Sequence, residues 1–221
     1  MGTVSRTLRR IDVRIFYLFN VRLRCRFMSL LMRFATNLGE FSFCCLYLVS
    51  ILILGNYELR FLALYTVFNI ISGHCIVQSI KRIVNRRRPY VSLHFAVPEK
   101  VTACRYSFPS GHTCTAFCLS FPIFFMHLHN LQFRSMSFFN MQSNYMTLDH
   151  IIFSNGFIIA AFALSLLVGI SRMYLGAHYP TDVICGILAS LISSIFVINF
   201  IPLLRLINFL ALLLCKKINI G

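Results

Sequence analysis

Five uncharged apolar stretches constrain the fold of this chain more than any other feature of its sequence. They cover residues 41–55, 61–80, 113–126, 151–170 and 183–204. A helix needs about 20 predominantly apolar residues to cross the hydrocarbon core of a bilayer. Two of the stretches are shorter than that, so flanking polar residues must complete those spans. The pattern predicts an all-α fold, an integral-membrane helical bundle.

A sixth apolar piece, residues 206–215, leaves the number of transmembrane helices at five or six. It follows Pro202 and Arg205, so it is either a bent continuation of the last span or an extra half-span. The composition agrees with lipid as the main solvent, because 58% of the 221 residues are hydrophobic and 12% are charged. A soluble domain is about half apolar and a quarter charged. The length suits one transmembrane domain with no room for a second.

The N-terminal 38 residues are basic and amphipathic. Short apolar runs alternate there with eight arginines: Arg6, Arg9, Arg10, Arg14, Arg22, Arg24, Arg26 and Arg33. This pattern predicts an interfacial segment, residues 1–38, of one or two amphipathic helices on the membrane surface, with residues 39–221 forming the transmembrane domain. The net charge of +15 suits an anionic membrane surface, an anionic substrate or nucleic acid. Nucleic acid is the weakest of these partners, because the basic residues lie between apolar spans.

Two polar segments, residues 81–110 and 171–182, are expected on the same face of the membrane. The apolar stretch 61–80 ends at the first segment, and the next two stretches cross the membrane and return to the second. The loop 127–150 between those two stretches is expected on the opposite face. Two polar clusters that are far apart in the sequence can therefore converge on one site.

Three motifs in these segments combine residues that suit a phosphate site. They comprise Lys81 with Arg88-Pro89, then Pro109-Ser110-Gly111-His112, then Ser171-Arg172 with His178 and Asp182. Ser110 is expected to cap a helix, and Gly111 lets the backbone approach a ligand closely. Pro180 is expected in the first turn of another helix, which places His178 at a helix N-terminus. Helix N-termini bind anions, so both positions favour phosphate.

The side chains of these motifs are sufficient for phosphoryl transfer. His178 can attack phosphorus, while Asp182 accepts the other ring N–H and stabilises the imidazolium. His112 can give a proton to the leaving oxygen and later take one from water. The equatorial oxygens can be held by Lys81, Arg88, Ser110, Gly111 and Arg172. No carboxylate cluster for Mg²⁺ and no paired Cys-x-x-Cys for zinc stands in the sequence, so no metal or other cofactor is expected.

In all three motifs the chain resembles the type 2 phosphatidic acid phosphatase and vanadium haloperoxidase superfamily. The signature of that family is Lys-(six)-Arg-Pro, Pro-Ser-Gly-His and Ser-Arg-(five)-His-(three)-Asp, and every position is present here in order. The resemblance covers residues 61–200. It implies that His178 is the nucleophile, Asp182 its partner and His112 the acid. It also implies that the phosphate is bound by Lys81, Arg88, Ser110, Gly111 and Arg172, with Ser171 as a further candidate.

The resemblance implies a membrane-embedded phosphatase that acts on a lipid phosphate or lipid pyrophosphate through a phosphohistidine. Candidate substrates are phosphatidate, phosphatidylglycerophosphate, a polyprenyl pyrophosphate and a lipid A phosphate, and the sequence does not choose among them. The expected partners are the substrate and membrane lipids, and no obligate protein partner is inferred.

Two other functions compete with this one. Vanadate-dependent halide oxidation belongs to a soluble branch of the superfamily, and the long apolar stretches argue against it. An anion-handling transporter would explain the basic cluster, but it has no need of a His–Asp pair with a second His at a helix start. The chain is expected to be a multi-pass protein of the cell membrane. The positive-inside rule places the arginine-rich face in the cytoplasm, whereas many relatives act on the outer face, so the sequence leaves the orientation open.

Overall fold

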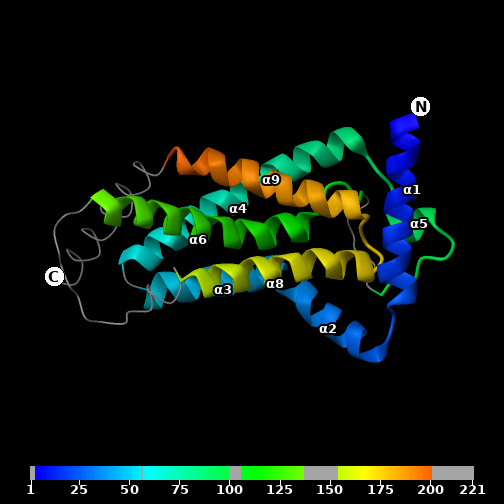
Figure 1. Cartoon of the computed structure of the whole chain (residues 1–221), viewed down its shortest axis with the longest axis horizontal. Helices are drawn as coiled ribbons and strands as arrows, with labels where there is room; N and C mark the ends of the chain where they lie inside the picture. Colours follow the sequence, from blue (N-terminus) through cyan, green and yellow to red (C-terminus); the bar gives the residue numbers. More distant parts are fainter. Residues whose placement is uncertain (1–2, 56, 100–105, 137–153, 201–221) are drawn as a thin grey trace.

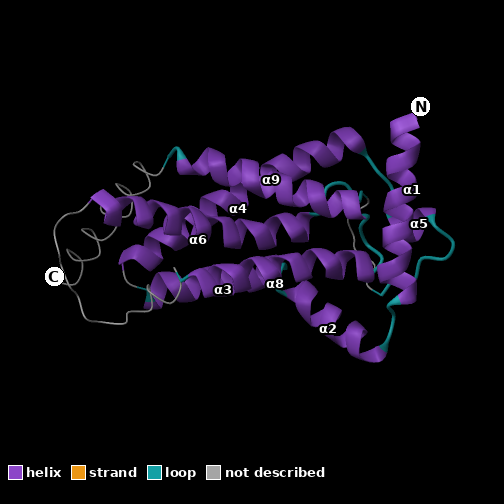
Figure 2. Cartoon of the chain, in the orientation of Figure 1, coloured by secondary structure: helices purple, strands orange, loops and turns teal. Residues whose placement is uncertain are grey.

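The computed structural model describes residues 3–55, 57–99, 106–136 and 154–200. Within these ranges it contains helices and loops but no strand, apart from one isolated bridge between Arg87 and Tyr106 (Figure 2). The helices are α1 (Thr3–Tyr17), η1 (Leu18–Arg22), α2 (Arg26–Asn37), α3 (Phe41–Leu54), α4 (Tyr57–Val84), α5 (Pro89–Ser92), α6 (Gly111–Met136), α8 (Asn155–Tyr174) and α9 (Pro180–Ile198). The all-α prediction is confirmed for the described residues.

Three of these helices are long and apolar enough to cross a membrane. They are α4 from Leu59 to Val84, α8 and α9, and α2 with α3 would add a fourth span if that pair, bent by 56°, is one broken helix. The 26-residue helix α6 contains the predicted stretch 113–126 but does not meet the same criterion of length and apolarity. The expected sixth piece, residues 206–215, lies outside the described residues. The structure therefore supports a membrane bundle and leaves five or six spans as a prediction.

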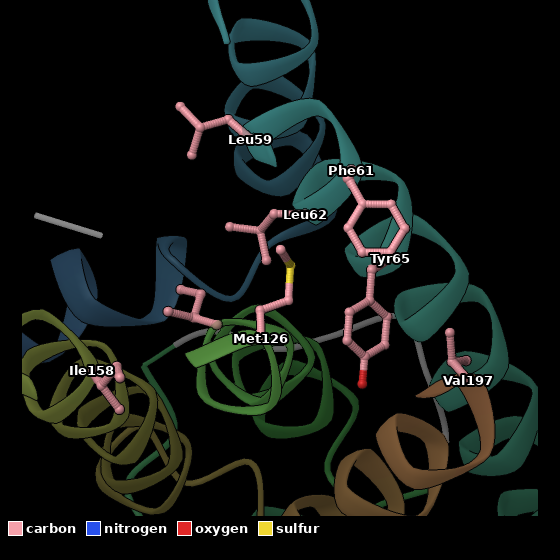
Figure 3. Close-up of a cluster of buried hydrophobic side chains, with 8 residues drawn as sticks. Leu59, Phe61, Leu62, Tyr65, Met126, Ile158 and Val197 are labelled. Atoms are coloured by element: carbon pink, nitrogen blue, oxygen red, sulfur yellow. The ribbon is translucent and has the colours of Figure 1, made fainter. Parts of the chain in front are cut away.

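Helix α6 occupies the middle of the bundle and packs against α4, α8 and α9. These helices run along the long axis of the molecule, and α1 crosses one end of them (Figure 1). Towards the other end, an apolar cluster joins α4, α6, α8 and α9 through Leu62, Tyr65, Met126, Ile158 and Val197 (Figure 3). The antiparallel order places the last turn of α4, the first turn of α6, the last turn of α8 and the first turn of α9 together beside α1.

Two glycines let the helices approach closely at this end. A Cβ on Gly186 of α9 would lie 2.7 Å from Ser110 O and 3.2 Å from Thr113 Cβ. A Cβ on Gly169 of α8 would lie 2.8 Å from Val183 Cγ1. Small residues at helix contacts allow the close backbone approach that stabilises membrane bundles. The two glycines therefore set the spacing of α6, α8 and α9 where the three motifs meet.

We expect Gly186→Ala to destabilise the protein, because its methyl group would overlap a backbone oxygen that cannot move independently. Overpacking of this kind costs about 1–3 kcal/mol. Thermal unfolding in detergent measures the change, and Gly156→Ala is the matched control because a Cβ there meets no atom within 4 Å. An unfolding temperature for Gly186→Ala equal to that of Gly156→Ala would contradict the close approach of α6 and α9.

Candidate active site

The three predicted motifs meet at the end of the bundle that α1 crosses. Ser110 N donates a 2.9 Å hydrogen bond to Asp182 O, which joins the start of α6 to the first turn of α9. Arg88 Nη1 donates to Ala177 O at 3.2 Å, so the Arg88-Pro89 motif contacts the loop between α8 and α9. These contacts confirm the prediction that residues 81–110 and 171–182 converge.

The first turn of α6 has the geometry of an anion-binding helix N-terminus. Ser110 Oγ accepts hydrogen bonds from Thr113 N at 3.4 Å and from Thr113 Oγ1 at 2.8 Å, so Ser110 caps the helix as predicted. In both bonds Ser110 Oγ is the acceptor, which leaves its O–H able to donate to a phosphate oxygen. A Cβ on Gly111 would meet no atom within 4 Å. The packing of the described residues therefore does not require glycine at this position, and the space in front of the Gly111 backbone is open.

His112 is the second residue of α6 and is half-buried. The turn between α2 and α3 packs against its backbone, because a Cβ on Gly39 would lie 3.0 Å from His112 O and 3.3 Å from His112 Cβ. Its place beside Ser110 and Gly111 puts the imidazole at the same helix end. This is the position that the acid role requires, and the role itself stays a prediction.

His178 and Asp182 form the centre of the site, and both are buried. His178 Nδ1 lies 3.6 Å from Asp182 Oδ2, slightly beyond hydrogen-bonding distance, and Nδ1 makes no hydrogen bond to any described residue. Arg88 Nη1 lies 3.4 Å from His178 Nε2. A guanidinium can only donate, so this contact favours a lone pair on Nε2 and the proton on Nδ1. That tautomer directs the proton to the carboxylate and the nucleophilic nitrogen away from it.

The carboxylate of Asp182 is held from several sides. Its Oδ2 accepts from Tyr179 N at 2.8 Å, the bond expected of an acid in the first turn of a helix. Its Oδ1 accepts from Arg86 Nη1 at 2.9 Å. Because each oxygen has a fixed donor, the side chain presents Oδ2 to His178 in one orientation.

Burial lowers the pKa of His178 from the ordinary value of 6.5 to about 4. The adjacent Asp182 carboxylate raises this pKa, while the nearby Arg172 and Arg88 lower it by their charge. Burial dominates, so the imidazole is neutral at physiological pH. A neutral ring with a lone pair on Nε2 is the form that can attack phosphorus.

The predicted phosphate-binding cations are all buried at this end of the bundle. The exposed fractions are 1% for Arg172, 2% for Arg88 and 8% for Lys81. Arg172 Nη1 donates to Thr36 Oγ1 at 2.6 Å, whereas its Nε makes no hydrogen bond to any described residue. Buried donors without a partner are rare and costly. The unsatisfied Nε therefore favours an anionic ligand at this position.

Ser171, the further candidate for phosphate binding, is used differently. Its hydroxyl donates to Val168 O at 2.6 Å within α8. The donor is thus occupied by its own helix in this structure. Among the described residues, no group of three His, Cys, Asp or Glu side chains is arranged to hold a metal ion.

Three residues at the site were not singled out by the sequence. Arg86, Thr181 and Asp12 form a hydrogen-bonded group next to Asp182. The sequence signal for Asp12 is that it is the sole acid among the first 36 residues, which otherwise carry eight arginines. Such a residue in a basic helix indicates a specific cationic partner elsewhere in the chain.

Comparison with known proteins identifies the family of the chain. The family model described as the PAP2 superfamily matches residues 62–205. The chain therefore belongs to the PAP2 superfamily and is a membrane phosphatase of that family. This assignment agrees with the resemblance that the three motifs carry.

Two of the curated relatives have phosphatase names, and the share of each relative that the match covers differs. Undecaprenyl-diphosphatase BcrC of Bacillus subtilis is 28% identical over 72% of this chain and 68% of its own length. Phosphatidylglycerophosphatase B of Bacillus subtilis is 34% identical over 43% of this chain, and the match spans 39% of that relative. A third relative has a transport name, the bacitracin transport permease protein BcrC of Bacillus licheniformis. It is 33% identical over 46% of this chain and 37% of its own length.

Two solved structures share the fold. LpxE of Aquifex aeolicus superposes with a TM-score of 0.64 at 21% identity, covering 86% of this chain and 95% of that one. A transmembrane PAP2 type phosphatidylglycerolphosphate phosphatase from Bacillus subtilis gives 0.61 at 24% identity, covering 90% and 87%. At these identities the likeness concerns the fold.

We expect the His178 imidazole of the resting enzyme to stay neutral until the pH falls to about 4. The unfolded chain takes up this proton near the ordinary pKa of 6.5. Between these values the unfolded state binds more protons, so this residue makes stability fall as the pH is lowered through that window. NMR titration of histidine-labelled protein, with the signal assigned by His178→Gln, measures the pKa. A midpoint near 6.5 would contradict the burial of the ring.

Proposed function

We propose that the chain hydrolyses a lipid phosphate or lipid diphosphate through a phosphohistidine at His178, without a metal. The observation that carries this proposal is the orientation of His178. Its Nε2 faces the Arg88 guanidinium, where a phosphate would be bound, and its Nδ1 faces Asp182. A buried neutral imidazole between a phosphate-binding cation and a carboxylate has the arrangement of an activated nucleophile.

In the first step His178 Nε2 attacks phosphorus and the bond from phosphorus to the lipid-side oxygen breaks. The leaving oxygen takes a proton from His112, and the Nδ1 proton of the new imidazolium is directed at Asp182 Oδ2. The products are a phosphohistidine and the lipid with one phosphate fewer, which is a lipid alcohol from a monophosphate and a lipid monophosphate from a diphosphate. Asp182 is suited to stabilise the imidazolium because its two oxygens are already fixed by Tyr179 N and Arg86.

In the second step water attacks the phosphohistidine, and His112 accepts a proton from this water. The P–N bond breaks, His178 returns to its neutral form, and inorganic phosphate leaves. The phosphate oxygens are proposed to bind Lys81, Arg88, Arg172, Ser110 and the backbone N–H of Gly111. Three buried cations and a helix N-terminus supply the charge that a metal ion supplies in many phosphoryl transfer enzymes.

An apolar cavity beside the site supports a lipid as the substrate. Its volume is about 240 Å³, and its lining comes from α3, α6, α8 and the turn before α3. Leu38 and Val168 belong to this lining. A Cβ on Gly39 would lie 2.8 Å from Val168 Cγ1 and 3.0 Å from His112 O, so one wall of the cavity adjoins the start of α6. An acyl or prenyl chain can occupy this space while its phosphate reaches the site.

We propose a polyprenyl diphosphate as the first substrate to test. Of the three curated relatives described above, the undecaprenyl-diphosphatase has the match that covers most of both chains. Phosphatidylglycerophosphate, phosphatidate and a lipid A phosphate follow as alternatives.

Transport is the second candidate function. One relative carries the name of a bacitracin transport permease, and the basic cluster would suit an anion as the transported species. Hydrolysis is favoured by the buried His178–Asp182 pair, which transport does not require.

We further propose that the chain is a multi-pass protein of the cell membrane, with residues 1–38 as an interfacial segment and residues 39–221 as the transmembrane domain.

We expect detergent-purified protein to release phosphate from undecaprenyl diphosphate in the presence of EDTA and to be inhibited by orthovanadate. His178→Ala should abolish release, because no other group takes over the attack on phosphorus. A phosphate assay over the four lipid substrates measures this. Release that is lost in EDTA and restored by Mg²⁺ would overturn the metal-free mechanism, and no release from any lipid would favour transport.

We expect His112→Ala to lose activity on lipid monophosphates but to retain much more on p-nitrophenyl phosphate. A lipid alkoxide needs a proton to leave, whereas p-nitrophenolate does not, and general acid help is worth about 10²–10⁴-fold. Steady-state rates on both substrates measure the difference, with His178→Ala inactive on both as the control. Equal losses on the two substrates would assign His112 to phosphate binding instead.

A further inference from the structure

Asp12 is a buried acid on a helix whose neighbouring side chains are basic. It lies in α1 between Arg10 and Arg14, and 3% of it is exposed. Helix α1 crosses the active-site end of the bundle (Figure 1). It also lies outside residues 62–205, which the family model matches.

Both carboxylate oxygens of Asp12 bind groups beside the His178–Asp182 pair. Oδ1 accepts from Thr181 N at 3.0 Å, and Oδ2 accepts from Thr181 Oγ1 at 2.7 Å. Oδ2 also accepts from Arg86 Nη2 at 2.7 Å. Thr181 immediately precedes Asp182, so Asp12 holds the first turn of α9 and its arginine partner together.

Arg86 connects the two acids. Its Nη1 donates to Asp182 Oδ1 at 2.9 Å and to Thr181 Oγ1 at 2.7 Å, while Nη2 binds Asp12. The guanidinium carbon lies 4.0 Å from the centre of the Tyr179 ring, which fixes the plane of the group from one side. A single arginine is therefore shared between a carboxylate of α1 and the carboxylate that faces His178.

We propose that Asp12 is a positioning residue for the reaction, acting on the His178–Asp182 pair through Arg86 and Thr181. The proposal rests on the function proposed above, in which Asp182 stabilises the imidazolium of His178. Asp12, Arg86 and Asp182 together carry a charge of −1, and without Asp12 the Arg86–Asp182 pair carries none. Arg86 alone would neutralise the charge that the imidazolium needs in the transition state.

The docking of α1 does not depend on Asp12 alone. Phe16 is fully buried, and its ring centre lies 5.9 Å from that of Tyr179. In η1, Asn20 Nδ2 donates to Tyr174 O at 2.7 Å and to Val97 O at 3.0 Å. These contacts hold the N-terminal segment in place independently of position 12, so Asp12→Asn, which removes the charge and replaces one acceptor oxygen by an NH₂ donor, tests this position without undocking α1.

The test uses the full chain in detergent with radiolabelled p-nitrophenyl phosphate as the probe. We expect Asp12→Asn to lower kcat roughly tenfold, by analogy with the lower end of the loss seen when an outer partner of a metal-binding histidine is removed. The KM and the inhibition by orthovanadate should be nearly unchanged, and rapid quench should show slower formation of the phosphohistidine. Arg10→Asn, an exposed position on the same helix, is the matched control and should keep the wild-type rate.

A double-mutant cycle separates positioning from a purely structural role. In an Arg86→Met background, Asp12→Asn should cause a smaller loss of kcat than in the wild type, because the path through Arg86 is already broken and only the contacts with Thr181 remain. If Asp12→Asn does not fold, Thr181→Val is the second variant, because it removes the hydroxyl that binds both Asp12 and Arg86. It should also lower kcat, by a smaller factor than the roughly tenfold expected for Asp12→Asn. An equal loss in both backgrounds, or a wild-type kcat for Asp12→Asn or for Thr181→Val, overturns the proposal for Asp12.

The same experiment tells this failure from failure of the proposed function. An active His178→Ala variant, or a wild-type enzyme that forms no phosphohistidine, overturns both proposals. An inactive His178→Ala variant with a fully active Asp12→Asn variant overturns the role of Asp12 and leaves the phosphatase mechanism standing.

Discussion

The hydrogen bond from Ser110 N to Asp182 O is the contact on which the active-site end depends. It joins the first turns of α6 and α9, and it forms because Gly186 lets the two backbones approach. Two helix N-termini then lie side by side with their positive ends in the same region. His112 belongs to one of these helices and Asp182 to the other, so this contact brings the proposed acid, His112, to the same end of the bundle as the His178–Asp182 pair.

The site concentrates positive charge in a part of the protein that excludes water. Arg172, Arg88 and Lys81 are nearly inaccessible, and Arg172 Nε lacks a hydrogen-bond partner among the described residues. Buried charges are costly unless they are compensated, so a concentration of cations here is consistent with the dianionic group that we propose as the ligand. The same burial keeps His178 neutral by lowering its pKa, which is the form that the proposed nucleophile needs.

Much of the fold and of the candidate site could be predicted because the signals are local. The stretches 61–80 and 151–170 fall largely within α4 and α8, since an apolar segment of that length is stable in lipid as a helix. Ser110 caps α6, and Pro180 begins α9, because capping and the fixed proline backbone act over a few residues. The motif spacing also identified the residues that the bundle brings together, although it did not give their distances or the tautomer of His178.

By itself the sequence determined a helical membrane protein of the PAP2 superfamily and the chemical groups of the proposed phosphate site. Only the tertiary structure decided that α1 packs against this site, that Arg86 is shared by Asp12 and Asp182, and that Thr36 binds Arg172. These contacts join residues 74 to 169 positions apart. Amphipathic periodicity shows which face of α1 is apolar, but it does not show which partner that face meets. The partner is the first turn of α9, and the position of that turn against α6 depends on side-chain size at single positions such as Gly186.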